Sequence, residues 1–540
     1  MKKLLITLGM LSATQSFAQL PIVFQSFDLY PGTGSSNPGS YAECNGKMFF
    51  VATTPGEGGE LWVSDGTIAG TQLVKDIYPG ATGSQPNEFL AFNGKLYFAA
   101  NDGTTGEELW VSDGTGAGTT LLKDIYPGAT SSMPLLAHFN NSIIMSADDG
   151  ASGTELWISD GTPAGTQLLK DIDPGAAPSV PSDFTVLNST TLLFAATTNT
   201  FGHELWKTDG TSSGTVMVKD IFPGNSGSDP YQITTAGSFA IFMASDGANG
   251  TEPWITDGTT AGTHLLKDIN PGPAPSNAQF FTVVNGNIYF GASDGTNGFE
   301  LWMSDGTTAG TNMLKDINPT GGSSPTRFTK FKDKIYFQAS DGASGLEPWY
   351  TDGTAAGTQM LTDLQPGTAP SYSISFTEYK DHLYFVGQST AGDVQLFRTD
   401  GTGTNTVQIA PPGPSFLNPL SPHSGLFVYD DALYLGADYG VIGRELWQLT
   451  DTTPTNSIVD IQPIDVEVFP NPSRGAFTVK LKNGITNGSI TVFDVLGKLM
   501  HEQAVEGNSA NIVLRSPAKG IYLVKLESGD AVITKRITVE

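Results

Sequence analysis

Short segments in which apolar and polar residues alternate follow one another along most of this 540-residue chain. Segments of this kind, rich in aromatic and β-branched side chains, are typical of half-buried β-strands. One representative stretch contains four of them: Glu88–Phe92, Lys95–Ala99, Glu108–Ser112 and Thr119–Ile125. Asn93-Gly94 is a hairpin signal between the first two segments, and the glycines of Asp113–Gly118 suit positive φ between the last two. The pattern predicts an antiparallel four-stranded unit and no helix.

Tryptophan marks the repetition of this unit. Seven of the eight tryptophans stand 47 to 49 residues apart; Phe397 fills the one gap, 48 residues after Trp349 and 50 before Trp447. The chain therefore carries nine units. The eight are Trp62, Trp110, Trp157, Trp206, Trp254, Trp302, Trp349 and Trp447. One tryptophan at a fixed point of every third strand predicts a buried framework position rather than a row of sugar-stacking platforms.

Four-stranded units that recur every 40 to 50 residues predict a β-propeller, in which each sheet packs against its neighbours. We expect an all-β fold with about nine four-stranded blades over residues 19–449. An open solenoid, or a ring with one irregular blade, is the alternative, because nine exceeds the usual number of blades. Phe27–Gly32 copies the fourth-strand ending Asp76–Gly80 but precedes the first complete unit. It predicts that an N-terminal strand closes the ring, unless Ile458–Ile461 takes that place.

The repeated motif has two parts, Glu-Leu-Trp-x-x-Asp-Gly-Thr and then Gly-Thr-x-Leu-x-Lys-Asp-Ile. From Phe24 to Trp447 the chain resembles the ELWxxDGT-repeat family of secreted bacterial proteins. The resemblance implies no enzymatic activity and indicates the scaffold more than the function.

Acidic residues dominate the repeats. Residues 19–462 hold 46 Asp/Glu against 16 Lys/Arg, whereas residues 463–540 hold eight against nine, and the whole chain carries a formal charge of −27. This excess argues against nucleic acid or an anionic membrane surface as a partner, because both are bound through clustered Lys and Arg. The single cysteine, Cys44, excludes an intramolecular disulfide and a Cys-based zinc cluster.

The N-terminus is typical of a secretory signal peptide. Lys2 and Lys3 precede the apolar run Leu4–Leu11, and Ser16-Phe17-Ala18 places small residues where signal peptidase cuts. We expect residues 1–18 to be removed. No later stretch approaches the roughly 18 apolar residues of a membrane span, so we expect no transmembrane segment.

The repeats stop after Trp447. Residues 450–462 are rich in turn formers and predict a linker, and the alternating segments of residues 463–540 predict a small β-sandwich. The motif residues of this tail are Pro470, Asn471, Pro472, Gly475, Gly520, Tyr522, Lys535 and Arg536. In this order at the C-terminus they resemble the type A sorting domain of the type IX secretion system. The resemblance implies handling by that machinery, translocation across the outer membrane and, commonly, removal of the domain with attachment to surface lipopolysaccharide. A generic adhesion sandwich is the alternative.

Catalytic and metal-binding patterns are weak. Gly210–Gly214 matches the G-x-S-x-G pattern of serine hydrolases but occupies a strand-to-strand turn, so we expect no nucleophile there. The histidines lack metal-ligand spacing: His138, His203, His264, His382, His423 and His501. Recurring Asp-Gly pairs such as Asp102-Gly103 and Asp113-Gly114 are candidate calcium ligands, although aspartate before glycine more often caps its own turn. We therefore predict no catalytic residue and no cofactor, with calcium as a weak alternative.

A glutamate and a lysine recur together with the tryptophan in six units. Placing Ser64 opposite Thr71 puts Trp62 opposite Leu73 and predicts a cross-strand ion pair between Glu60 and Lys75. The equivalent pairs are Glu108–Lys123, Glu155–Lys170, Glu204–Lys219, Glu252–Lys267 and Glu300–Lys315. If the turn of the Phe397 unit is two residues shorter, Gln395 faces Gln408 there. Glu347 faces Thr362, without an ionic partner.

Two functions fit the sequence. A non-enzymatic protein, secreted or displayed on the cell surface, would bind or adhere to a glycan or protein ligand that the sequence does not identify. An extracellular polysaccharide-acting enzyme with its site at the propeller channel is the alternative. It would require one unit to break the pattern with convergent catalytic groups, and the units of Phe397 and Trp447 lose motif residues without gaining such a set. We therefore favour binding.

Overall fold

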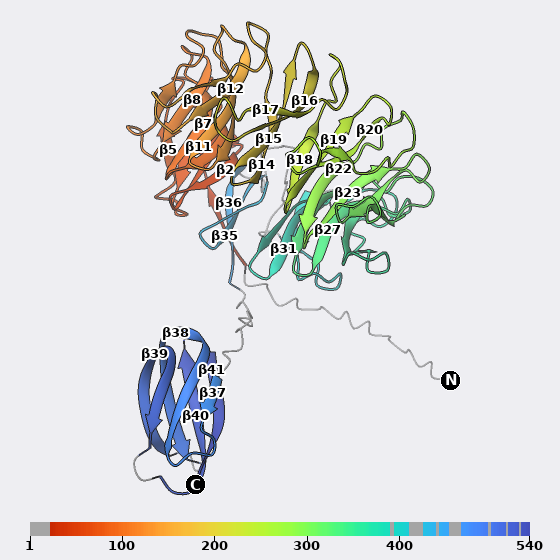
Figure 1. Ribbon diagram of the computed structural model, residues 1–540. Helices are drawn as coiled ribbons and strands as arrows, with labels where there is room; N and C mark the ends of the chain where they lie inside the picture. The colour runs from red at the N-terminus through yellow and green to blue at the C-terminus, as the bar shows by residue number, and fades with distance from the viewer. Residues whose placement is uncertain are drawn as a thin grey trace, which may run out of the picture. The chain divides into compact units, whose positions relative to one another are not determined.

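The computed structural model describes residues 22–388, 394–409, 425–438, 442–452, 466–494, 498–514, 517–528 and 531–540. The chain divides into two compact units, Met1–Thr453 and Pro454–Glu540 (Figure 1). The described residues contain strands and no helix, which confirms the all-β prediction. The predicted signal peptide, Ile458–Ile461 and His423 lie outside these residues.

Nine four-stranded antiparallel sheets make up the described part of the first unit. Sheet 1 is β2 (Gly39–Cys44), β3 (Lys47–Thr54), β4 (Gly58–Ser64) and β5 (Gln72–Lys75). Sheet 2 is β6 (Asn87–Phe92), β7 (Lys95–Asn101), β8 (Glu107–Ser112) and β9 (Thr120–Lys123). Sheet 3 is β10 (Leu135–Phe139), β11 (Ser142–Asp148), β12 (Thr154–Ser159) and β13 (Gln167–Lys170). Sheet 4 is β14 (Ser182–Asn188), β15 (Thr191–Thr198), β16 (Gly202–Thr208) and β17 (Val216–Lys219).

The later sheets follow the same order along the chain. Sheet 5 is β18 (Tyr231–Ala236), β19 (Phe239–Ser245), β20 (Thr251–Thr256) and β21 (His264–Leu265). Sheet 6 is β22 (Gln279–Val284), β23 (Asn287–Ser293), β24 (Phe299–Ser304) and β25 (Asn312–Lys315). Sheet 7 is β26 (Thr326–Phe331), β27 (Lys334–Ser340), β28 (Leu346–Thr351) and β29 (Gln359–Met360). Sheet 8 is β30 (Ile374–Tyr379), β31 (His382–Gln388), β32 (Val394–Thr399) and β33 (Val407–Ile409). Figure 1 shows the sheets arranged one after another around a common centre.

Sheet 9 takes strands from both ends of the unit. It contains β34 (Phe427–Tyr429), β35 (Ala432–Asp438) and β36 (Arg444–Asp451), and its fourth strand is β1 (Ile22–Phe27). Phe27 lies opposite Leu446, as Lys75 lies opposite Leu61 in sheet 1. The prediction that an N-terminal strand completes the last sheet is confirmed, although the strand ends at Phe27 instead of continuing to Gly32. β36 continues through Asp451, two residues into the predicted linker.

Each pair of neighbouring sheets shares one hydrophobic cluster. Phe98 and Trp110 of sheet 2 pack with Leu61 of sheet 1, and the same arrangement recurs at every following interface between consecutive sheets. A ninth cluster joins Phe27 and Tyr434 of sheet 9 to sheet 1. The seven tryptophans from Trp62 to Trp349 are 5–9% exposed, which confirms their predicted framework role.

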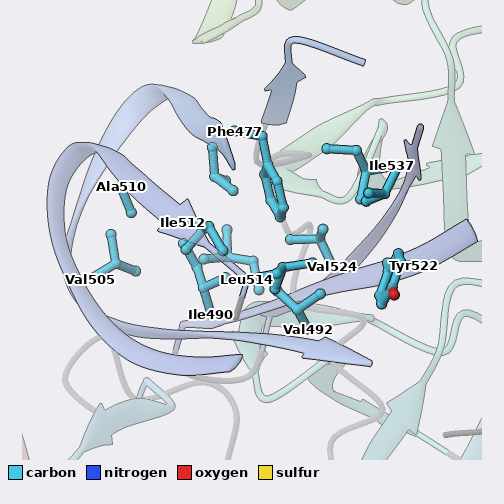
Figure 2. Close-up of a cluster of buried hydrophobic side chains, with 13 residues drawn as sticks. Phe477, Ile490, Val492, Val505, Ala510, Ile512, Leu514, Tyr522, Val524 and Ile537 are labelled. Carbon is cyan, nitrogen blue, oxygen red and sulfur yellow. The ribbon is translucent and has the colours of Figure 1, made fainter. Parts of the chain in front are cut away.

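The second unit is a five-stranded antiparallel sheet with its own core. Its strands are β37 (Val466–Phe469), β38 (Ala476–Asp494), β39 (Leu499–Val513), β40 (Gly520–Ser528) and β41 (Ala531–Val539). β38 pairs with β37 through its first half and with β40 through its second half, so the predicted sandwich is one continuous hydrogen-bonded sheet. Figure 2 shows Phe477, Ile490, Tyr522 and Ile537 in the buried cluster between its strands.

Candidate functional site

The recurring glutamate is fully buried and anchors the loop that leads to the next sheet. In sheet 4, Glu204 accepts hydrogen bonds from the backbone N–H groups of Ile221, Phe222 and Ser228 at 3.0 Å and from the Ser228 hydroxyl at 2.6 Å. Burial raises the pKa of this carboxyl group above its ordinary value. In sheet 9, Glu445 holds Leu29 and Ser36 of the N-terminal segment in the same way.

The predicted glutamate–lysine pairs are wrong. Trp62 faces Leu73 and Ser64 bonds to Thr71, as expected, but a bulge between Leu61 and Trp62 shifts the register and places Lys75 opposite Leu61. The same shift precedes Trp110, Trp157, Trp206 and Trp302. In sheet 8 the turn keeps the seven-residue spacing between Thr399 and Thr406, and Gln408 faces Phe397 instead of Gln395. Glu347 accepts a hydrogen bond from Leu364 N–H, and β29 ends before Thr362.

The recurring lysine instead connects one sheet to the next. Lys219 Nζ of sheet 4 donates to the carbonyl of Thr263 in sheet 5 at 2.7 Å and lies 5.6 Å from the centroid of the Trp254 ring. Lysines 75, 123, 170, 267 and 315 donate to the equivalent carbonyl, and all of these except Lys170 also lie over the next tryptophan ring. The repeated glutamates and lysines are therefore engaged in the framework.

The aspartates of the Asp-Gly-Thr turns bind their own turns. Asp209 Oδ1 accepts hydrogen bonds from the Thr211 N–H at 2.8 Å and the Thr211 hydroxyl at 2.7 Å, and these bonds lower the pKa of Asp209. The second set of Asp-Gly turns is built alike: Asp102 accepts from Thr104 and Thr105. Within the described ranges, no group of three or more His, Cys, Asp or Glu is placed to hold a metal ion. Calcium binding stays an untested alternative.

The first strands share a recurrent irregularity in their pairing with the second strands. In seven sheets the pairing of the first and second strands shifts register at the same place, a β-bulge. The bulged residues all have positive φ although none is glycine: Ser40, Glu88, Asp183, Gln232, Phe280, Arg327 and Ser375. The first strands of neighbouring sheets lie close to one another, and we call the side of the sheets that they form the inner edge. Both faces of each sheet are covered by the neighbouring sheets, so an exposed side chain on a first strand projects from this edge.

Neighbouring bulges bond to each other. Asp183 Oδ1 accepts a hydrogen bond from Gln232 N–H, and Gln232 Oε1 accepts one from Phe280 N–H, both at 2.9 Å. The Phe280 side chain is 42% exposed, and Arg327 is exposed on the next sheet. An amide, an aromatic ring and a guanidinium group therefore follow one another along the inner edge of sheets 5 to 7, which we call the inner-edge site. Sequence periodicity did not reveal it, since the bulge residues share no residue type.

A cavity of about 520 Å³ opens between sheets 7 and 8. It is lined by Lys334, Tyr350, Gln359–Thr362 and Gly401–Thr404. The lysine of the regular interfaces is Thr362 here, and its tryptophan partner is Phe397. Lys334 Nζ lies 3.8 Å from the centroid of the Tyr350 ring, whose hydroxyl donates to Gln359. The cavity lies where the repeated interface contacts are missing.

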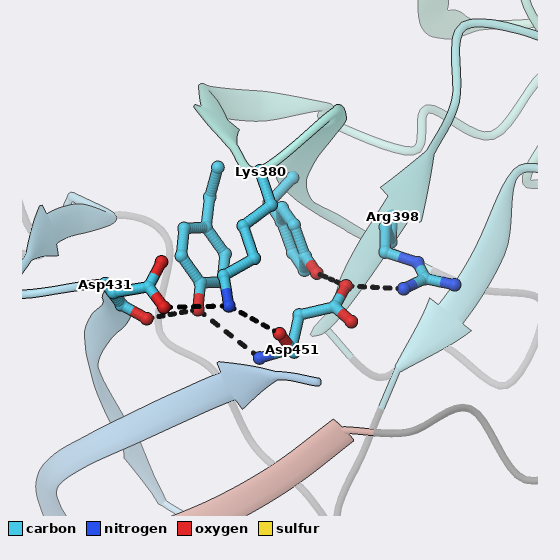
Figure 3. Close-up of polar contacts among 6 residues, drawn as sticks. Lys380, Arg398, Asp431 and Asp451 are labelled. Atoms are coloured by element: carbon cyan, nitrogen blue, oxygen red, sulfur yellow. Dashed lines mark hydrogen bonds and ion pairs between the residues drawn. The ribbon is translucent and has the colours of Figure 1, made fainter. Parts of the chain in front are cut away.

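Sheets 8 and 9 share a buried polar network (Figure 3). Arg398 Nη1 and the Tyr384 hydroxyl both donate to Asp451 Oδ2 at 2.6 Å, and Asp451 is fully buried. Lys380 Nζ bonds to the Asp451 carbonyl at 2.8 Å and pairs with Asp431 at 3.0 Å. Asp451 occupies the position that the turn glycine has in other sheets. There the glycine carbonyl accepts a hydrogen bond from the tyrosine that corresponds to Tyr384. Tyr336, for example, donates to Gly401 O. This network holds the end of β36.

Other residues considered from the sequence do not converge on a site. His203 Nδ1 lies 3.4 Å from Asp229, while His138, His264, His382 and His501 lie on separate strands. Ser212 of the G-x-S-x-G match lies in the turn between β16 and β17, where its carbonyl accepts a hydrogen bond from Lys170.

The tail motifs meet around the C-terminal strand. Asn471 bonds to the Arg536 carbonyl at 3.0 Å and to the Thr538 N–H at 2.9 Å. Pro470 and Pro472 are exposed beside Asn471, and Lys535 and Arg536 are exposed on β41. Tyr522 is buried and lies opposite Ile537. Gly475 has φ of +90° and accepts a hydrogen bond from Leu514 N–H, while Gly520 begins β40.

Comparison with known proteins identifies the tail. Residues 467–540 match the family model of the secretion system C-terminal sorting domain. This domain indicates handling by the type IX machinery and secretion across the outer membrane to the cell surface or extracellular space. No helix among the described residues is long and apolar enough to cross a membrane.

Other similarities are partial. An ulvan lyase of Nonlabens ulvanivorans is 31% identical over 109 residues, 20% of each chain, and an endo-acting ulvan lyase of Formosa agariphila is 36% identical over 63 residues, 12% of each chain. The match thus spans at most a fifth of these relatives. Among solved structures, a prolyl endopeptidase has a TM-score of 0.40 at 11% identity, and the match covers 83% of this chain and 55% of that chain. Saccharomyces cerevisiae Sqt1 has a TM-score of 0.37 at 10% identity, and the match covers 72% of this chain and 100% of that chain. Likenesses at this level do not assign a fold.

Proposed function

We propose that the exported protein is a nine-bladed β-propeller of ELWxxDGT repeats that binds a glycan or protein ligand and catalyses no reaction. Nine four-stranded sheets, nine shared hydrophobic clusters and the pairing of β1 with β36 support the propeller. Because β36 extends through Asp451, the domains are then residues 19–451 for the propeller, 452–462 for the linker and 463–540 for the sorting domain.

One observation carries the binding role. The repeated glutamates and lysines are engaged in framework contacts, whereas four of the seven bulge residues are exposed: Glu88, Asp183, Phe280 and Arg327. A non-glycine residue at positive φ costs roughly 1–2 kcal/mol, so seven such positions are a large cost to stability. Strain of this kind concentrates at binding sites, and bulges re-aim side chains there. The inner edge is therefore the surface that would meet a ligand.

Glycan and surface-protein arrays probed with the full mature chain, with and without calcium, test this role. We expect saturable binding and no product when the bound polysaccharide is incubated with the protein. Absence of binding to every array component would refute the binding role. New reducing ends or unsaturated products would instead establish the alternative, a polysaccharide-acting enzyme, which the partial likeness to ulvan lyases favours.

Export is tested separately. Deletion of residues 463–540 should leave the first unit folded but retained in the periplasm, since the sorting domain carries the signal. Cell fractionation with an antibody to the first unit provides the measurement. Normal surface levels of the truncated protein would contradict this role, and the mass of the exported protein would show whether the tail is cleaved.

A further inference from the structure

The inner-edge site combines two exposed side chains, Phe280 and Arg327, with the half-buried Gln232. Phe280 and Arg327 both have φ of +65°, the highest values among the non-glycine residues that the structure describes. Left-handed backbone is costly for bulky residues, and an exposed aromatic ring gains little from burial. Glycine or asparagine would adopt this backbone at lower cost. The fold therefore does not explain why phenylalanine and arginine stand at these two positions, and we look for the reason in what their side chains bind.

We infer that Gln232, Phe280 and Arg327 bind a saccharide that carries a carboxylate; this inference rests on the proposed binding function. The three lie on consecutive sheets, and the hydrogen bond from Phe280 N–H fixes the orientation of the Gln232 amide. Gln232 Oε1 is occupied by this bond, so the Nε2 group is the part of the amide available to donate to a ligand.

Charge determines the class of saccharide. Arg327 makes no ion pair within the described ranges, although carboxylates outnumber cations almost threefold in residues 19–462. A guanidinium group binds a carboxylate through two parallel hydrogen bonds. A sugar ring joins a flat C–H face, which suits the exposed Phe280 ring, to hydroxyl groups that accept from Gln232. A uronate residue offers all three features in one unit.

The experiment measures binding of the full mature chain to tetragalacturonate, with cellotetraose as the neutral probe, by titration calorimetry. We expect saturable binding of tetragalacturonate and at least tenfold weaker binding of cellotetraose. Phe280→Gly and Arg327→Gly should each weaken tetragalacturonate binding at least tenfold. The unfolding temperature of both variants should stay equal to that of the wild type or rise, because glycine adopts positive φ without strain. A merely structural role predicts the reverse pattern.

Two matched controls locate the site. Ser375→Gly changes the equivalent bulge of sheet 8 and should leave affinity unchanged. Thr362→Lys restores the regular lysine in the cavity between sheets 7 and 8 and should also leave it unchanged.

Four results would overturn the inference while leaving the proposed function intact, and three of them come from the calorimetry. These three are equal binding of the two tetrasaccharides, unchanged affinity in both glycine variants, and loss of affinity in Thr362→Lys alone, which would move the site to the cavity. Array binding to proteins only would also overturn the inference. Absence of any array ligand would refute the proposed function itself.

Discussion

The regular sheets, 1 to 6, and the closing sheets, 8 and 9, are held to their neighbours by different contacts. In sheets 1 to 6 an Asp-Gly-Thr turn joins the third and fourth strands, and a lysine connects each sheet to the next. In sheet 9 the third and fourth strands, β36 and β1, come from opposite ends of the unit and have no turn between them. There the buried Arg398–Asp451 pair and its tyrosine and lysine neighbours hold the strand end. The network therefore joins sheet 9 to sheet 8, whereas a single lysine joins each regular sheet to the next.

The largest effect should come from removing the closing strand. Deletion of residues 19–32 removes β1, Phe27 from the cluster shared with sheet 1, and the hydrogen bond that Leu29 N–H donates to Glu445. It leaves β36 as an exposed edge. We expect a loss of more than about 5 kcal/mol in the free energy of unfolding, enough to unfold a marginally stable unit. Tryptophan fluorescence during urea unfolding measures this, because every tryptophan lies in the first unit. Unchanged stability would contradict non-covalent closure by β1.

The next effect compares equivalent positions in the two regions. Arg398→Met removes the guanidinium partner of the buried Asp451 carboxylate, which keeps its hydrogen bond from the Tyr384 hydroxyl, and should cost about 3–5 kcal/mol. Lys207→Met changes the corresponding position in sheet 4, where the half-buried lysine donates to the Gly258 carbonyl, and should cost about 1 kcal/mol. Urea unfolding provides both values. Equal losses would show that the closing network has no special role.

The buried glutamates differ in how many donors they meet. Glu204 accepts four hydrogen bonds, so in Glu204→Gln the amide NH₂ would face N–H donors, at a cost of about 3 kcal/mol. Glu347→Gln should cost less than about 1 kcal/mol, because the Leu364 N–H bond needs only the carbonyl oxygen. Gln395 already occupies the equivalent place in sheet 8. Equal unfolding energies of the two variants would contradict this explanation.

The same glutamates show what periodicity reveals and what it misses. The repeat predicted the strands, the tryptophan framework and the origin of the closing strand, because each depends on residue type at fixed spacing. It misplaced Lys75 by one position, because a bulge inserts a residue without changing the spacing of motifs. The partners of Glu204 are mostly backbone N–H groups, which leave no side-chain pattern. Arg398 and Asp451 belong to no repeat, so only the fold brings them together.

The smallest effect is a difference in pH dependence between the glutamates with many and few donors. Burial raises the pKa of Glu347 from 4.5 to about 7, and the folded state therefore favours its protonated form. The stabilisation is fully present below pH 4.5 and is lost as the pH rises towards 7. Each pH unit within this window corresponds to about 1.4 kcal/mol, so raising the pH from 5.5 to 7.5 should cost roughly 2 kcal/mol at this residue.

The other carboxylates also titrate in this range, so the informative quantity is the difference between the wild type and Glu347→Gln in their pH profiles. Glutamine does not ionise, and the variant should lose about 2 kcal/mol less than the wild type between pH 5.5 and 7.5. Glu252, whose pKa burial also raises to about 7, meets two backbone donors at 2.9 and 2.7 Å, and Glu252→Gln should flatten the profile similarly. Parallel pH profiles for the wild type and both variants would mean that these carboxyl groups stay ionised when buried. The raised pKa values of Glu347 and Glu252 would then be contradicted.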